Sequence, residues 1–150
     1  MAGKSDKFEY DVLRLIFNGV ALPNLGTTSG TTSLWIGLHT ADPGDAGSTA
    51  NEGGYNEYTR VATDRSTAAS GWAITSGTSN AVASASPVGT INFPQSVATT
   101  STGTFGWFSV FPSSNAQGSS AIYSGTVAPV INFSQGVTPQ VTTASSITED

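Results

Sequence analysis

The sequence contains no cysteine, and charged residues make up only 10% of its 150 residues. Without cysteine, disulfide bonds, thiolate nucleophiles and sulfur-bound zinc sites are excluded. Only five residues are basic, against ten acidic ones. This balance argues against nucleic-acid binding, which requires clustered lysine and arginine for the phosphates. No apolar run approaches the ~20 residues of a membrane-spanning helix, so no membrane partner is predicted.

Histidine is nearly absent as well, since His39 is the single one in the chain. A metal site built from several histidines is therefore excluded, and no nucleophile stands next to His39 in the sequence. A lone histidine at the end of a strand is usually a hydrogen-bonded structural residue, and we interpret His39 in this way. No cofactor is predicted.

What the chain has in excess is serine and threonine, 21 of each, together with 17 glycines. Combined with valine and aromatic residues, this composition favours short strands joined by many turns. The charges are unevenly placed: all but the last two lie between Lys4 and Arg65, and residues 66–148 contain none. A free surface normally carries mixed charges that resist association. We therefore expect much of this uncharged region to be covered in an assembly.

One helix is predicted, over Ser5–Gly19, because Ser5 is a good N-cap and Asn18-Gly19 is a stop signal. Its apolar residues at helical spacing are Phe8, Val12, Leu15 and Ile16, with Leu13 and Phe17 widening the face. This face either packs on its own domain or docks on another subunit, and we treat it as a candidate interface. The predicted organisation is a helical arm, residues 1–26, followed by a β-sandwich domain, residues 27–150.

Short strands separated by proline and glycine account for the rest of the chain and predict an all-β, jelly-roll-like sandwich of about eight strands. Phe105 and Trp107 lie in a strand with aromatic residues on both faces, so both are candidate interface residues. The predicted strands are Leu34–Thr40, Tyr58–Thr63, Gly71–Thr75, Asn80–Ala85, Thr90–Phe93, Thr104–Phe111, Ala121–Val127, Pro129–Phe133 and Gln140–Thr143.

The loop between the first two strands begins with Asp42-Pro43-Gly44-Asp45, which predicts a structural turn with Gly44 at positive φ. Arg60 follows this loop, and we expect it to hold the loop by a bidentate contact to a carboxylate. The acidic residues of this stretch could instead bind Ca²⁺ or serve glycoside hydrolysis, although neither motif is complete. They are Asp42, Asp45, Glu52, Glu57 and Asp64.

Several segments, in this order, resemble a group of tailed-bacteriophage small jelly-roll virion proteins. They are Leu38–Gly47 (LHTADPGDAG), Tyr58–Ala62 (YTRVA), Ile91–Pro94 (INFP), Gly103–Phe111, Tyr123–Gly125 and Gly136–Thr148. The resemblance implies a capsid cement or decoration protein, although members are often labelled tail fibre proteins. It brings no catalytic residues.

We therefore predict a non-enzymatic virion protein that is assembled in the host cytoplasm and lies on the capsid surface. Its expected partners are the major capsid protein and further copies of itself, as a dimer or trimer. The alternative is a tail-fibre or receptor-binding module that contacts host surface glycans. A glycan-cleaving enzyme that uses the loop carboxylates is a third hypothesis.

Overall fold

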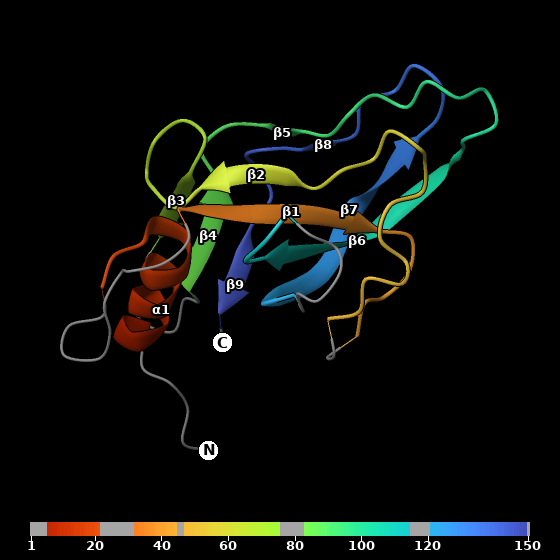
Figure 1. The fold of residues 1–150 in the computed structure, drawn as a ribbon. Coiled ribbons are helices and arrows are strands. Elements are labelled where there is room, and N and C mark those ends of the chain that lie inside the picture. The colour runs from red at the N-terminus through yellow and green to blue at the C-terminus, as the bar shows by residue number, and fades with distance from the viewer. Residues whose placement is uncertain (1–5, 22–31, 45–46, 76–82, 115–120, 150) are drawn as a thin grey trace. The chain divides into compact units, whose positions relative to one another are not determined.

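The computed structural model describes residues 6–21, 32–44, 47–75, 83–114 and 121–149 (Figure 1). One helix and nine strands are present in these residues, which confirms the predicted all-β class with a single helix. The elements are α1 (Asp6–Asn18), β1 (Ser33–His39), β2 (Val61–Asp64), β3 (Trp72–Thr75), β4 (Ala83–Pro87), β5 (Ile91–Asn92), β6 (Gly103–Phe111), β7 (Tyr123–Phe133), β8 (Gln140–Val141) and β9 (Ile147–Glu149). No described helix has the length and apolar character needed to cross a membrane.

The chain divides into two compact units, and the first of them contains the helix. This helix unit comprises residues 1–32, 64–90 and 142–150. Its sheet has the order β3-β4-β9, and α1 contacts all three strands. The buried residues Leu13 and Phe17 form the inner side of α1, and the Phe17 ring lies 4.6 Å from the ring of Trp72. Hydrophobic burial of this kind is the main force that holds a short helix to a sheet.

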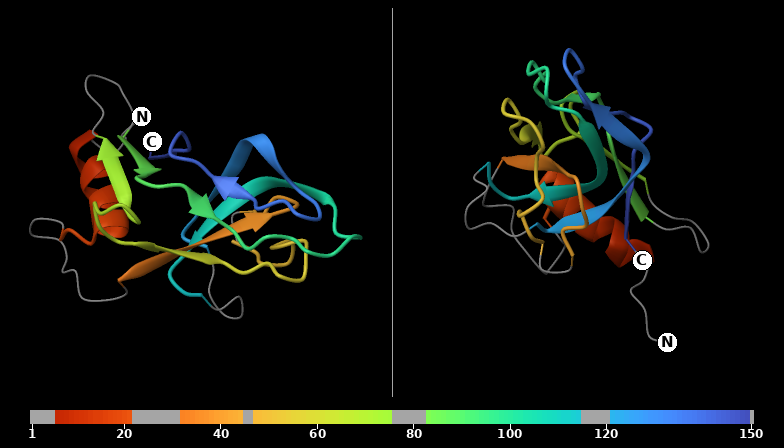
Figure 2. Two further views of the ribbon diagram at one scale, coloured as in Figure 1. Left: turned by 90° about the horizontal axis from the view of Figure 1, so that it is seen from above. Right: turned by 90° about the vertical axis from the view of Figure 1, so that its right-hand side faces the viewer.

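The second unit, the sheet unit, comprises residues 33–63 and 91–141. Its main sheet has the order β2-β1-β6-β7, in which Trp35 pairs with Phe111 and His39 with Trp107. The long strands β6 and β7 run side by side, with a register shift between Phe105 and Trp107 (Figure 2). A short β5-β8 ribbon belongs to the same unit.

An aromatic core gives the sheet unit its sandwich-like layering. Phe93, directly after β5, stacks on Tyr58 at 5.9 Å, and Tyr58 in turn lies 5.9 Å from Phe105 of β6. Tyr55 and Phe133 complete this group of rings, with Phe133 4.7 Å from Phe105. Each ring buries a large apolar area, so this core accounts for much of the unit's stability.

The two compact units group the chain in another way than the predicted arm, residues 1–26, and sandwich, residues 27–150, which stays a prediction. The helix shares a unit with strands from the middle and the end of the chain, because its inner face packs on β3 and β4. Such contacts between segments distant in sequence leave no local signal that sequence reasoning could use.

The largest differences from the predicted strands concern β7 and β9. One strand, β7, contains most of the two predicted strands Ala121–Val127 and Pro129–Phe133. Proline is tolerated in it because β7 is an edge strand, in which a residue whose N–H would face outward has no partner strand to donate to. The strand β9 was not predicted, because it has three residues and only Ile147 is apolar. The predicted strand Asn80–Ala85 lies partly outside the described residues, and β4 begins at Ala83.

Candidate functional site

Arg60 and Glu52 form a buried ion pair in the sheet unit. Arg60 Nε donates to Glu52 Oε1 and Arg60 Nη2 donates to Glu52 Oε2, both at 2.7 Å. The two side chains are only 2% and 6% exposed. The bidentate carboxylate contact expected of Arg60 is therefore present, and Glu52 is the carboxylate that accepts it.

The ion pair contacts two strands of the main sheet, β6 and β1. Arg60 Cζ lies 3.3 Å from the ring centroid of Phe111 in β6, and Nη1 donates to the Ser113 carbonyl at 3.0 Å. A Cβ atom on Gly37 of β1 would lie 2.9 Å from both Glu52 Oε1 and the Phe111 ring. Glycine at position 37 is thus required for the carboxylate to reach the sheet.

Tyr58 joins the same cluster from the loop side. Its hydroxyl accepts a hydrogen bond from the Leu38 backbone N–H at 2.7 Å and donates to Glu52 Oε1 at 3.4 Å. Burial raises the pKa of Tyr58 well above its ordinary value, so the hydroxyl stays protonated and can donate. The cluster therefore connects the loop after β1 to the centre of the sheet.

His39 lies in the same unit and is fully buried, with its ring 6.2 Å from that of Phe111. Neither of its ring nitrogens has a hydrogen-bond partner among the described residues, and the same holds for Ser109 Oγ. His39 is thus a buried residue, as the structural interpretation requires, but the expected hydrogen bond is absent from the described part of the chain. A nucleophile hydrogen-bonded to a base, which covalent catalysis requires, is not formed by these two residues.

The burial of His39 predicts a dependence of stability on pH. Burial lowers the pKa of His39 below its ordinary value of 6.5; the Glu52 carboxylate partly opposes this shift and Arg60 adds to it. Below pH 6.5 the His39 side chain is protonated in the unfolded chain before it is protonated in the folded one. The free energy of unfolding is therefore highest above pH 6.5 and decreases as the pH falls below this value. We expect the free energy of unfolding to be lower at pH 5.5 than at pH 7.

The check is urea denaturation at both pH values, with His39→Gln as the control, because the chain has no other histidine. The variant should lose this part of the pH dependence. An identical pH dependence in both proteins would show that His39 does not titrate as its burial requires.

The predicted turn is present where the structure describes it. Asp42 Oδ1 accepts a hydrogen bond from the Gly44 N–H at 2.8 Å, and Gly44 has a φ of 64°. Pro43 is buried, and its carbonyl accepts from the Ser48 N–H at 2.9 Å. Asp45 lies outside the described residues. Among those described, no three acidic or histidine side chains gather closely enough to hold a metal ion.

The helix face packs within its own unit, which was one of the two alternatives. Leu13 and Phe17 are fully buried, whereas Val12, Leu15 and Ile16 are half-buried. The backbone of Phe8 lies in α1, but its side chain is outside the described part of the chain. The Arg65 guanidinium donates to the carbonyls of Ile16, at 2.6 Å, and Leu15, which ties the end of α1 to the segment after β2.

The two aromatic interface candidates in β6 occupy different environments. Phe105 is fully buried in the aromatic core of the sheet unit, so it is a core residue rather than an exposed interface side chain. Trp107, on the other side of the register shift, is half-buried. The register shift lies between them, since Phe105 pairs with Ile131 and Trp107 with Thr126, and its extra residues belong to β7.

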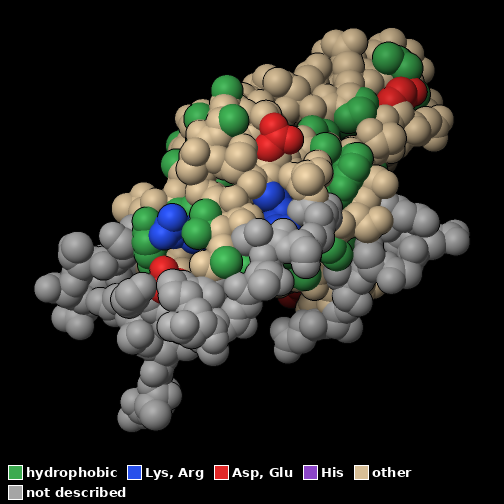
Figure 3. Space-filling view, turned by 60° about the vertical axis from the view of Figure 1, so that its left-hand side comes forward, with side chains coloured by type: hydrophobic (Ala, Val, Ile, Leu, Met, Phe, Trp, Pro, Cys, Tyr) green, Lys and Arg blue, Asp and Glu red, His purple; other side chains and the backbone are tan. Residues whose placement is uncertain are grey.

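Sequence reasoning expected the uncharged residues 66–148 to be covered in an assembly but did not single out the outer edge of β7. This strand has 11 residues, lies at the end of the sheet order and contains no charged residue. Val130 is 52% exposed, and Ile122, directly before the strand, is 44% exposed. On the face that Figure 3 shows, the described surface is mostly tan, with scattered hydrophobic side chains and few charged ones. The uncharged sequence of residues 121–133 was the available signal.

Comparison with known proteins gives one family. The model of a family described as podophage GP4 fiber I protein gp80 matches residues 3–148. No curated protein matches the chain. The family match agrees with the resemblance to tailed-phage virion proteins, and it covers both compact units. The chain therefore belongs to the family of podophage GP4 fiber I protein gp80 and is a bacteriophage virion structural protein.

Proposed function

We propose that this protein is a structural subunit of a virion fibre and that it assembles through the exposed edge of β7. Its family name supports the fibre role. The observation that carries the assembly mechanism is the position of β7, an uncharged strand of 11 residues at the edge of the main sheet. The role requires no catalytic residue and no cofactor.

An open sheet edge presents unpaired backbone N–H and C=O groups, which can pair with another strand. Proteins that must remain monomeric protect such edges with lysine and other charged residues, or with proline. In β7 such protection is present in one part only: Pro129 lies in a stretch where the pairing with β6 is interrupted, between Thr126 and Ile131, whereas Tyr123–Thr126 contains no charged residue and no proline. A second copy of β7 is the occupant that we propose, because two identical antiparallel edges can pair symmetrically.

The exposed apolar side chains along this edge would add to the pairing. Val130 and Ile122 are each about half exposed, and burial of such a side chain contributes roughly 1 kcal/mol when half of its surface is covered. The hydroxyl side chains of Ser124 and Thr126 can form cross-strand hydrogen bonds.

The test is the mass of the purified protein in solution, measured by light scattering over a range of concentrations. Val130→Lys places a charge on the edge and should weaken self-association about tenfold or more. Val88→Lys is the matched control, since Val88 is also exposed, at 39%, but belongs to the helix unit. A monomeric wild-type protein, or equal effects of the two variants, would contradict assembly through β7.

Capsid cement is the second candidate, and the absence of charge from residues 66–148 favours it. A cement protein covers joints between major capsid subunits with a large contact surface, and an uncharged, hydroxyl-rich surface suits that role. The two candidates differ in location and in copy number, because a cement protein is present in many more copies per particle than a fibre.

A further inference from the structure

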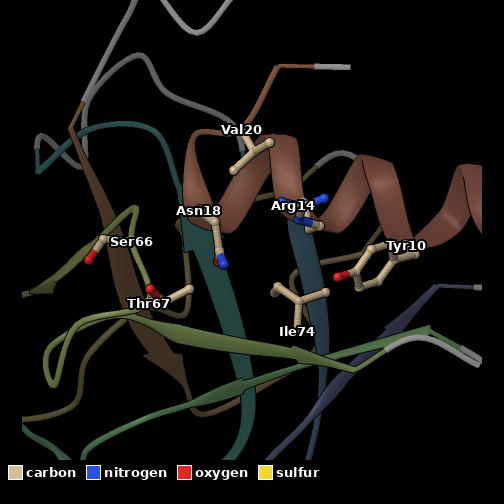
Figure 4. Close-up of a pocket in the computed structure, with 7 residues that line it drawn as sticks. All are labelled: Tyr10, Arg14, Asn18, Val20, Ser66, Thr67 and Ile74. Carbon is tan, nitrogen blue, oxygen red and sulfur yellow. The ribbon is translucent and has the colours of Figure 1, made fainter. Parts of the chain in front are cut away.

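The helix unit contains a pocket with a volume of about 450 Å³. This size lies within the range of small-molecule sites, about 300–1,000 Å³. Figure 4 shows side chains from α1 on one side and from β3 and the segment after β2 on the other. The lining includes Tyr10, Arg14, Asn18, Ser66, Thr67 and Ile74.

Arg14 is the cation of this pocket. It forms no ion pair with any described residue, and its Cζ lies 5.3 Å from the centroid of the Tyr10 ring. An aromatic ring restricts the guanidinium without neutralising it. Arg14 therefore retains its donors for an anionic group, and a carboxylate matches the planar guanidinium best.

Asn18 lies one turn further along the same helix face, and its side chain points toward Thr67 in Figure 4. Its Oδ1 atom is buried and has no hydrogen-bond partner in the described structure. An unpartnered acceptor of this kind costs free energy. Because Oδ1 is buried, a ligand hydroxyl in the pocket can donate to it only when the amide rotates and Nδ2 takes the buried position.

The remaining lining favours a ligand with many hydroxyl groups and an apolar face. Ser66 and Thr67 contribute hydroxyls, which both donate and accept hydrogen bonds. Ile74 points from β3 toward the helix and supplies apolar surface opposite Arg14 (Figure 4). Sugars combine hydroxyl groups with C–H faces, and only a sugar acid adds the carboxylate that Arg14 selects.

We propose that this pocket binds a sugar acid, with its carboxylate on Arg14 and its hydroxyls on Asn18 and Thr67. The site lies in the helix unit, whereas β7 belongs to the sheet unit, so this proposal is independent of the assembly mechanism. The chain has a net charge of −5, which repels anions at long range. We therefore expect weak binding of a single sugar.

The experiment is ligand-observed NMR titration of the full chain with glucuronate, glucose and acetate. Glucuronate should bind at least about tenfold more tightly than either glucose or acetate, because only it satisfies both Arg14 and the hydroxyl-bearing residues. Arg14→Gln should weaken glucuronate binding about tenfold or more, and Arg14→Lys should weaken it less.

Thr75→Val is the matched control, since Thr75 is exposed on β3 and does not line the pocket. It should leave glucuronate binding unchanged, and circular dichroism confirms that each variant is folded. Equal binding of acetate and glucuronate, no binding at all, or binding that Arg14→Gln leaves intact would overturn the proposal. The mass of Arg14→Gln in solution should equal that of the wild type, so a failure here is distinct from a failure of assembly.

Discussion

Replacement of Glu52 by glutamine is expected to destabilise the protein by about 3–5 kcal/mol. The variant keeps the shape of the side chain but removes the negative charge that Arg60 requires. Arg60 is 2% exposed and stacked on Phe111, so its charge has no access to water as compensation. The free energy of unfolding, from urea denaturation monitored by tryptophan fluorescence, measures the loss.

Glu57→Gln is the matched control for this prediction. Glu57 belongs to the same loop, and its Oε2 accepts an exposed hydrogen bond from the Val97 N–H at 3.3 Å. The same chemical change there should cost no more than about 0.5 kcal/mol. The double variant Glu52→Gln with Arg60→Gln should cost less than the sum of the single changes. Additive effects, or equal losses for Glu52 and Glu57, would contradict a buried ion pair.

Phe105→Ala is expected to lower the free energy of unfolding by about 3–5 kcal/mol. Phe105 is fully buried, and its ring lies among those of Tyr55, Tyr58 and Phe133. Truncation removes apolar contacts and leaves a cavity that the surrounding rings cannot fill. Urea denaturation measures this loss directly.

Trp107→Ala provides the comparison, because Trp107 is half-buried in the same strand. It should cost clearly less stability than Phe105→Ala, in spite of the larger side chain. If Phe105→Ala preserved stability but reduced the mass of the protein in solution, Phe105 would be an interface residue after all, as its sequence pattern first indicated.

Much of the fold could be predicted because its signals are local. The helix ends near Asn18-Gly19, where the sequence has a stop signal, and β6 ends at Phe111, directly before Pro112. The prediction for β7 was less accurate, since a proline in an edge strand looks the same in sequence as a proline that ends a strand. The short strand β9 depends on pairing with β4, which lies some 60 residues earlier, and no local pattern marks it.

The candidate site could be predicted only in part. Arg60 was identified because it is one of few cations and follows a run of acidic residues, but the sequence does not distinguish Glu52 from its neighbours. Glu52 can reach Arg60 because Gly37 has no side chain and so leaves space above the sheet for the Glu52 carboxylate. The pocket beside α1 could not be predicted, because it is formed by segments that are more than 40 residues apart.

The central claim, that this protein is a fibre subunit of the virion, is tested most directly by locating it on purified particles. Gold-labelled antibody raised against the protein should mark the fibres in electron micrographs, with few copies per particle. Label distributed evenly over the capsid surface would identify a cement protein and contradict the fibre role. If the particles carry no label although denaturing gels of the same preparation contain the protein, its epitopes are covered, and cryo-electron microscopy of the particles replaces the label. We predict density for both units at the fibres. Density for both units on the capsid shell would contradict the fibre role.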